Sequence, residues 1–255
     1  MNYWGRIFFI YEGETLTRIL GQSLENHTSN CTAILEKFAS SYFHEETRDR
    51  LMTAVELHDL GKRDTFRIRY DEYEERDKEK GKGKRARKGK GQVNERGKLV
   101  YSFAGHRFRV PHDDPYVAGL IRAHHEFSVQ QINREKARLL SEEDKKRFAD
   151  DLYLLCMADQ LEAELAVKAV EEKEDVPRTF MEFTTVRSDM QPGTFTVVPW
   201  PFGVSSFSLS FDLKELSLDG LDRKNPKTVQ EALKEAKNFE QEKITINLSE
   251  KLDEH

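Results

Sequence analysis

The sequence predicts a mainly α-helical domain over residues 1–175, followed by a small C-terminal appendage, a β-hairpin with a short helix, over residues 176–255. Two observations lead to this prediction. Apolar residues recur every three to four positions through much of the first segment, which is typical of helices that pack one face into a core. After Pro177 the spacing changes to alternation, which is typical of strands.

The composition suits one large domain, or one domain with a small appendage. Of the 255 residues, 37% are hydrophobic and 34% are charged, enough for a core beneath a heavily solvated surface. No apolar run approaches the ~18 residues of a membrane span, and the first apolar stretch is too short for a signal peptide. Cys31 and Cys156 form no C-x-x-C pair, which indicates a reducing compartment. We therefore expect a cytoplasmic protein.

The first elements predicted are a strand and two helices. Residues 5–12 form a short apolar segment, and residues 15–38 have helical spacing. His27 falls inside that helix, where a histidine taken alone is more often a core or surface residue. The next helix covers residues 46–60 and ends at His58-Asp59, with Gly61 as its stop.

A basic segment interrupts this pattern at residues 71–98. Between Arg76 and Lys98 the chain has eleven basic and three acidic residues, a net charge of +8, with interleaved glycines and almost no apolar residues. Such a segment cannot bury enough surface to offset its ordering entropy, so we expect a flexible insertion. It is either a solvated loop or an arm that contacts phosphates.

Two further helices follow the insertion. The apolar run Leu99–Phe103 leads to His106, and a helix from about Tyr116 ends at His124-His125. Neighbouring histidines on a helix point about 100° apart, so they can share one ion only where the helix end distorts or both reach around it. Residues 141–172 are expected to form a long helix or a kinked pair of helices, with Asp159 among apolar neighbours. A carboxylate there is costly unless it is paired or binds metal.

Strand patterns dominate after Pro177. Residues 194–198 and 204–211 alternate, and residues 199–203 connect them, so we expect a β-hairpin whose aromatic residues either cap the helical core or form a docking face. Asn225-Pro226 is expected to begin a last short helix that ends near Asn238. The chain beyond Gln241 is expected to fray.

The candidate site residues are all histidines or aspartates. The pair His58-Asp59 combines an imidazole nitrogen with a carboxylate whose two oxygens can bridge two ions. Cys31 and Cys156 each lie about one turn from one of these residues, as core thiols or as further ligands. The set comes from five separate segments, as a site that encloses metal requires: His27, His58, Asp59, His106, His124, His125 and Asp159.

The ordered pattern H…HD-x-G-K…H…HH…D resembles the HD superfamily of metal-dependent phosphohydrolases, and most of all the stand-alone HD nuclease subunit of type I CRISPR–Cas interference. The resemblance covers roughly residues 20–165 and implies an HD-domain helical bundle. It also implies that Asp59 and Lys62 are catalytic, and that Asp59 bridges two ions. The other ligands it implies are His27, His58 and Asp159 for one ion, and His106, His124 and His125 for the other.

The resemblance further implies a substrate and partners. We expect cleavage of single-stranded DNA, with a separate helicase subunit and an RNA-guided surveillance complex as partners. An imidazole-rich ligand set favours Mn, Ni, Co, Fe or Zn over Mg. The residues expected to contact DNA phosphates are Lys82, Lys84, Arg85, Arg87, Lys88 and Lys90.

Two other functions stay open at this stage. One is an HD phosphohydrolase that acts on nucleotides or cyclic dinucleotides. His124-His125-Glu126 is similar to that branch, but Phe127–Gln130 stands where a Gly-Tyr-Pro signature is expected. The other is a degenerate HD scaffold that only binds partners, against which the seven intact motif residues argue.

Overall fold

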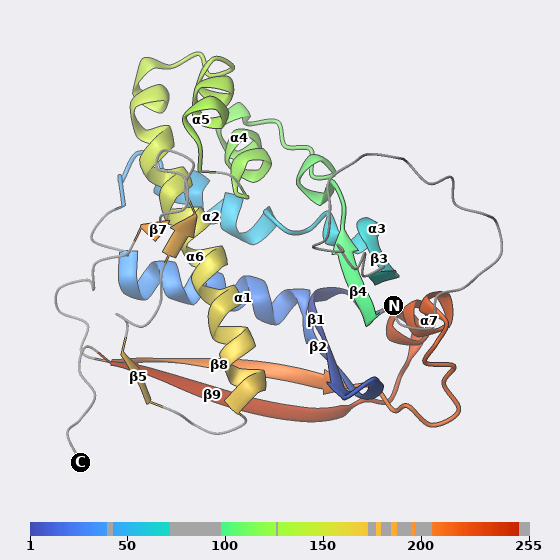
Figure 1. Cartoon of the computed structure of the whole chain (residues 1–255). Helices are drawn as coiled ribbons and strands as arrows, with labels where there is room; N and C mark the ends of the chain where they lie inside the picture. The colour runs from blue at the N-terminus through green and yellow to red at the C-terminus, as the bar shows by residue number, and fades with distance from the viewer. Residues whose placement is uncertain are drawn as a thin grey trace, which may run out of the picture.

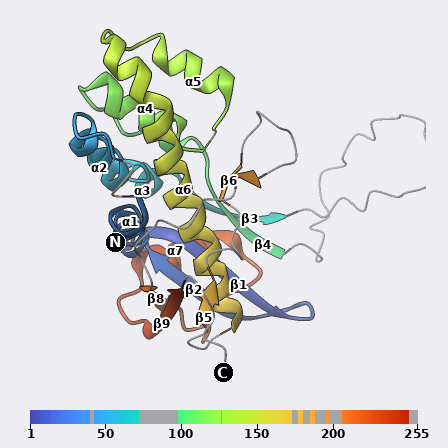
Figure 2. The same ribbon diagram turned by 90° about the vertical axis from the view of Figure 1, so that its left-hand side faces the viewer.

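The structure is a computed structural model, and it describes residues 1–39, 43–71, 98–125, 127–172, 177–179, 185–187, 195–196 and 206–249. Helices and a twisted sheet pack against each other, and α6 reaches from the level of α5 to the sheet in both views (Figures 1 and 2). The helices are α1 (Leu24–Ile34), η1 (Leu35–Ala39), α2 (Arg48–Leu57), α3 (Lys62–Thr65), η3 (His106–Phe108), α4 (Pro115–Ala123), α5 (Val129–Lys136), α6 (Glu142–Glu172) and α7 (Pro226–Glu235).

The largest sheet has five strands in the order β1-β2-β8-β9-β5, and β8 pairs with β9 in antiparallel register along its whole length. Two small sheets, β3-β4 and β6-β7, complete the described strands. The strands are β1 (Trp4–Glu12), β2 (Thr15–Ser23), β3 (Phe66–Asp71), β4 (Lys98–Phe103), β5 (Pro177–Thr179), β6 (Thr185–Arg187), β7 (Phe195–Thr196), β8 (Ser206–Glu215) and β9 (Glu240–Ser249).

Two apolar clusters hold these elements together. The larger joins α1, α2, α4 and α6 to one face of the sheet, where Phe211 of β8 and Ile246 of β9 are buried. The second lies where β1 and β2 pack against β3, β4 and α7, with Trp4 and Val229 among its members. Each fully buried side chain of this size stabilises the fold by roughly 1.5–3 kcal/mol.

Residues 15–23 form a strand, so the helix expected from Thr15 was wrong at its start. Both faces of β2 are covered: Ile19 belongs to the second cluster and Leu20 to the larger one, and both are fully buried. A strand buried on both faces loses its alternation, and its apolar spacing then imitates a helix. The helix begins only at Leu24, where Oγ of Ser23 accepts a hydrogen bond from the backbone N–H of Asn26 at 3.1 Å.

The expected mainly α class is corrected to a mixed α/β fold. β8 pairs with β2 and β9 in the large sheet, whereas Phe195–Thr196 pairs with β6, so the described strands do not form the expected hairpin. Residues 197–205, which would connect it, lie outside the described residues. The end expected to fray is largely β9, anchored by buried Ile244 and Ile246. The division at residue 175 stays a prediction.

Other expectations are confirmed. The strand near the N-terminus, the long helix over residues 142–172 and the short helix that begins at Pro226 all form. Among the described residues, none of the helices is long and apolar enough to cross a membrane.

Candidate metal centre

The structure brings all seven predicted residues to one place. His27 lies on α1, His58-Asp59 directly after α2, and Asp159 in the middle of α6. His106 begins η3 and His124-His125 follow α4, so the centre lies where four helices and one short turn meet. All of these side chains are mostly buried except that of His125.

Asp59 stands between two groups of histidines. Its Oδ2 lies 2.9 Å from Nε2 of His27 and 3.4 Å from Nε2 of His58. Its Oδ1 lies 2.9 Å from Nε2 of His106 and 3.6 Å from Nε2 of His124. The two oxygens of one carboxylate thus face two separate sets of ring nitrogens, as a bridging ligand requires.

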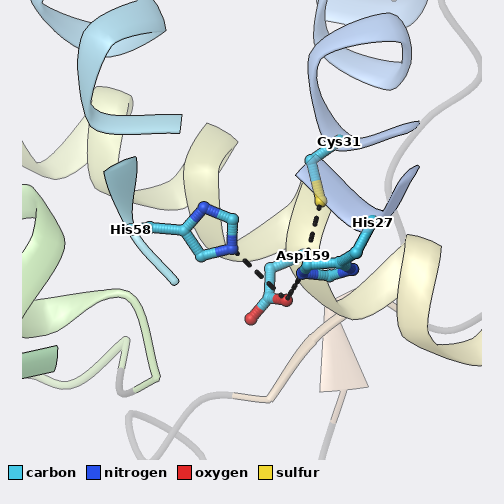
Figure 3. A group of neighbouring side chains, drawn as sticks. All are labelled: His27, Cys31, His58 and Asp159. Atoms are coloured by element: carbon cyan, nitrogen blue, oxygen red, sulfur yellow. Dashed lines mark hydrogen bonds and ion pairs between the residues drawn. The ribbon is translucent and has the colours of Figure 1, made fainter. Parts of the chain in front are cut away.

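The first set also contains Asp159 (Figure 3). Its Oδ1 lies 3.3 Å from Nε2 of His27 and 3.8 Å from Nε2 of His58. Cys31 lies beside the same atoms, so its thiol belongs to this group. We call His27, Cys31, His58 and Asp159 the first donor group.

The second donor group consists of Asp59, His106, His124 and His125. The Nε2 atoms of His106 and His125 lie 3.0 Å apart, so both rings face the same point. Neighbouring histidines inside a helix would point in different directions, but α4 ends at Ala123, before the pair. His124 and His125 follow the helix in a turn, where their rings come within 4.1 Å of each other between centroids.

Backbone carbonyls fix three of the rings. In each case Nδ1–H donates to the carbonyl three residues earlier, a group that a helix end or turn leaves without an intrahelical partner. Nε2 then carries the lone pair and is the atom free to bind a cation. The pairs are His58 with Val55 (2.6 Å), His106 with Phe103 (2.7 Å) and His124 with Ile121 (2.6 Å).

Among the described residues, several buried atoms at the centre make no hydrogen bond, although Oδ2 of Asp59 does form an ion pair with Nζ of Lys62. Within the described part of the chain, Nε2 of His58, Nε2 of His124 and both carboxylate oxygens of Asp59 make no hydrogen bond. Such atoms cost roughly 1–3 kcal/mol each when left unpaired in a protein interior. Cations in the two donor groups would pair all four atoms, so the residues present fit a dinuclear metal site.

The close packing of buried histidines and carboxylates at the centre also shifts the pKa values of these side chains. Although burial opposes it, Asp59 raises the pKa of His58 to about 10. Burial lowers the pKa of His124, which keeps that ring neutral and ready to bind metal. Asp59 and Asp159 thus draw a proton onto the His58 ring when no cation offsets their charge.

A protein-family model described as the HD domain matches residues 24–164, more than half of the chain. The chain belongs to the HD domain family. The matched segment contains every residue of both donor groups, and the chain is therefore an HD-domain, metal-dependent phosphohydrolase whose two donor groups are consistent with a dinuclear site. Comparisons with curated proteins and with solved structures gave no match.

Lys62 of the HD-x-G-K turn lies inside the centre. Its Nζ is 2.5 Å from Oδ2 of Asp59 and donates to the carbonyl of Gly5 at 3.2 Å. Although burial opposes it, Asp59 raises the pKa of Lys62, so the side chain is an ammonium. The structure thus places this charge beside the Asp59 carboxylate, and its contact with a phosphate stays a prediction.

Gly61 of the same turn allows a close approach. A Cβ at this position would lie 2.1 Å from the carbonyl oxygen of His106, although the φ angle of −65° suits any residue. The glycine is therefore needed for space, and it lets the turn after His58 and Asp59 touch the turn that begins at His106.

Glu162 was not among the residues predicted from the sequence. It is fully buried on α6, its Oε2 lies 2.5 Å from Nδ1 of His27, and its Oε1 accepts from Nε2 of Gln22 at 2.5 Å. Although burial opposes it, the His27 ring lowers the pKa of Glu162, which keeps the carboxylate charged. Its position three residues after Asp159, on the same helix face, was the available signal.

The second donor group is the open side of this HD domain. Phe103, Gly105, His106, Arg107 and His125 line a cavity of about 430 Å³ that opens to solvent. Beside it Phe108 is 61% exposed, and its ring lies 4.9 Å from the guanidinium of Arg107. The six basic residues expected to bind DNA lie outside the described residues: Lys82, Lys84, Arg85, Arg87, Lys88 and Lys90.

Proposed function

We propose that this HD-domain hydrolase is a nuclease that cleaves phosphodiester bonds of single-stranded DNA during CRISPR interference. The observation that carries the proposal is the position of Asp59, whose oxygens face two donor groups, one enclosed and one beside an open cavity. This arrangement suits hydrolysis of a phosphate ester by two ions a few ångströms apart.

The residues would divide the work as follows. His27, His58 and Asp159 would hold one ion, His106, His124 and His125 the other, and Asp59 both. When bound, the ions supply a hydroxide nucleophile and neutralise charge on the phosphate. The carbonyl-bound Nδ1 atoms hold the His58, His106 and His124 rings in place. Lys62 adds a fixed positive charge beside the bridging carboxylate, where it can meet a non-bridging phosphate oxygen.

The open side supports a polynucleotide substrate. Phe108 offers an exposed ring on which a base can stack, and Arg107 and Arg109 supply positive charge within three residues of the ligand His106. Stacking on aromatic side chains and contacts to phosphates are how single strands are bound without sequence preference. The basic segment at residues 71–98 would extend the contact along the backbone.

The partners belong to the same proposal. The sequence contains no G-x-x-x-x-G-K-[ST] motif, which fits a nuclease that receives single-stranded DNA from a separate helicase. We propose such a helicase, acting at an RNA-guided surveillance complex, as the source of this DNA. An imidazole-rich centre favours Mn, Ni, Co, Fe or Zn over Mg.

One assay compares the candidate functions. The purified protein is stripped of metal, reloaded with manganese or nickel, and given labelled single-stranded DNA, duplex DNA, nucleotides and cyclic dinucleotides. We expect shortening of the single strand that stops with chelator and is lost in Asp59→Asn. Turnover of nucleotides or cyclic dinucleotides alone would favour the small-molecule phosphohydrolase, and metal binding without any hydrolysis would favour a scaffold.

A further inference from the structure

Cys31 adds a sulfur atom to the first donor group. It lies one helical turn after His27 on α1 and is fully buried. The donor atoms of His27, Cys31, His58 and Asp159 all lie within 4.8 Å of one another. Figure 3 shows these side chains converging from α1, from the end of α2 and from α6.

The contacts of the two cysteines differ. Sγ of Cys156 donates to the carbonyl of His124 at 2.9 Å, so that thiol has a close partner. Among the described residues, the hydrogen-bonding contacts of Sγ of Cys31 are long, 3.8 Å to the carbonyl of Ala158 and 3.9 Å to Nε2 of His27. A neighbouring donor atom also lacks a partner, because Nε2 of His58 is buried without a hydrogen bond among the described residues. A cation at this place would pair with it.

We propose that Cys31 is a thiolate ligand of the ion held by the first donor group. This rests on the proposed function only in that the chain binds metal, and it adds a ligand type that the His/Asp motif does not contain. On binding, the thiol loses its proton to solvent and the sulfur forms a bond to the cation.

The spacing of the donor atoms supports this ligand. Counting Asp59, five donors would face this ion, and neighbouring donors around a four- or five-coordinate ion with bonds of about 2.0–2.3 Å lie about 2.8–4.0 Å from one another. Nε2 of His27 lies 3.3 Å from Oδ1 of Asp159 and 3.9 Å from Sγ of Cys31. One ion among these three atoms therefore requires little movement of any side chain.

The proposal gives the two metal positions different characters. With Cys31 the first position would have five protein donors, of which Asp159, 15% exposed, is the most accessible to solvent. The second position faces the open cavity through exposed His125. A sulfur ligand also shifts the preference of the first position toward softer ions such as zinc and cobalt, and away from manganese.

The test is X-ray absorption at the zinc edge of the full-length protein loaded with zinc. We expect a sulfur shell at about 2.3 Å, amounting to one sulfur for every two zinc ions. The chain has only two cysteines, so each can be assigned by substitution. The shell should persist in Cys156→Ser and vanish in Cys31→Ser. A spectrum of the unmodified protein without sulfur, or a shell that vanishes in Cys156→Ser, would overturn the proposal.

Two further measurements make the result unambiguous. Circular dichroism shows whether Cys31→Ser folds. If it does not, the unmodified protein and Cys156→Ser still decide, because Cys31 is then the one thiol present. Cleavage of DNA by a protein without a sulfur shell removes only this inference, whereas a sulfur shell without any hydrolysis upholds the ligand and counts against the nuclease.

Discussion

Glu162 and His27 are joined by a contact of 2.5 Å between Oε2 and Nδ1, which turns Nε2 of the ring toward Asp59. The rings of His58, His106 and His124 donate instead to backbone carbonyls, which no substitution can remove. The orientation of His27 therefore depends on one side chain. A charged acceptor at Nδ1 also makes the other nitrogen a stronger ligand.

Glu162→Gln keeps the size of the side chain and removes its charge, and we expect it to weaken the first metal position about 10–100-fold. The measurement is titration of the metal-free protein with zinc against a competing chelator. Glu164→Gln, the same change on the same helix outside both donor groups, should leave both affinities as they were. Equal affinities in the two variants would contradict a role for Glu162.

Asp59→Asn should disrupt both positions, because an amide oxygen carries no charge and its nitrogen is no ligand. We expect the metal content to fall below about two ions per chain. The rate of hydrolysis should fall more than ~100-fold, which exceeds the effect of losing an outer-shell partner. Elemental analysis and a phosphodiesterase assay measure the two effects. Asp150→Asn, a change at an exposed carboxylate that pairs with His44, is the matched control. Full metal content together with full activity in Asp59→Asn would refute the bridge.

Gly61→Ala should force the His58–Lys62 turn away from η3, since the new Cβ would meet a backbone oxygen. We expect a loss of about 1–3 kcal/mol in the free energy of unfolding, together with weaker metal binding. Gly220→Ala is the control: its φ of +69° adds strain, but no atom lies within 4 Å of the new Cβ. Gly220→Ala should lower the free energy of unfolding by about 1–2 kcal/mol and leave metal binding intact. Denaturant melts and metal titrations test both variants.

Metal binding should strengthen as the pH rises. In the metal-free protein the raised pKa of His58, about 10, means that its proton stabilises the fold fully below the unfolded value near 6.5. This contribution is lost as the pH rises toward 10, while cations bind only the neutral ring. We therefore expect the Tm difference between metal-loaded and chelated protein to widen between about pH 6.5 and 9. A difference that narrows would contradict the assignment, and His58→Gln should flatten the trend.

Phe108→Ala should weaken binding of single-stranded DNA, because stacking of a base on an aromatic ring contributes about 1–3 kcal/mol. That corresponds to a KM raised roughly 5–150-fold, with hydrolysis of a small aryl phosphodiester unchanged. Leu140→Ala alters another apolar side chain, one that is 93% exposed and outside the cavity lining, and should change neither. Equal loss on both substrates would assign Phe108 a structural role.

Seven residues of the two donor groups could be predicted from the sequence because their order resembles the HD motif and because some of them lie in apolar surroundings. Asp159 lies between buried Ala158 and Leu161, where a carboxylate has few uses besides pairing or metal binding. Glu162 gave only a weak signal, its position three residues after Asp159, because α6 carries many other acidic residues. Its role appears only once α1 places His27 against it.

The sheet was harder to predict because its strands lack regular alternation or lie far apart in the sequence. β2 is buried on both faces, and its apolar spacing imitates a helix. β9 has four charged or amide residues before its first buried isoleucine, and its partner β8 lies more than twenty residues earlier. Pairing of this kind depends on tertiary contacts that local patterns do not encode.

Strand β8, far from α1 in the sequence, supports the segment of α1 that carries His27. β2 continues directly into α1, and the side-chain amides of Asn26 and Asn30, on either side of His27, donate to the backbone carbonyl of Ser210 in β8. A protein shortened to residues 24–164 would keep every residue of the two donor groups but lose β8, to which α1 is hydrogen-bonded. Evolution or engineering that recombines this segment with other proteins must therefore carry the flanking strands along, or supply new ones.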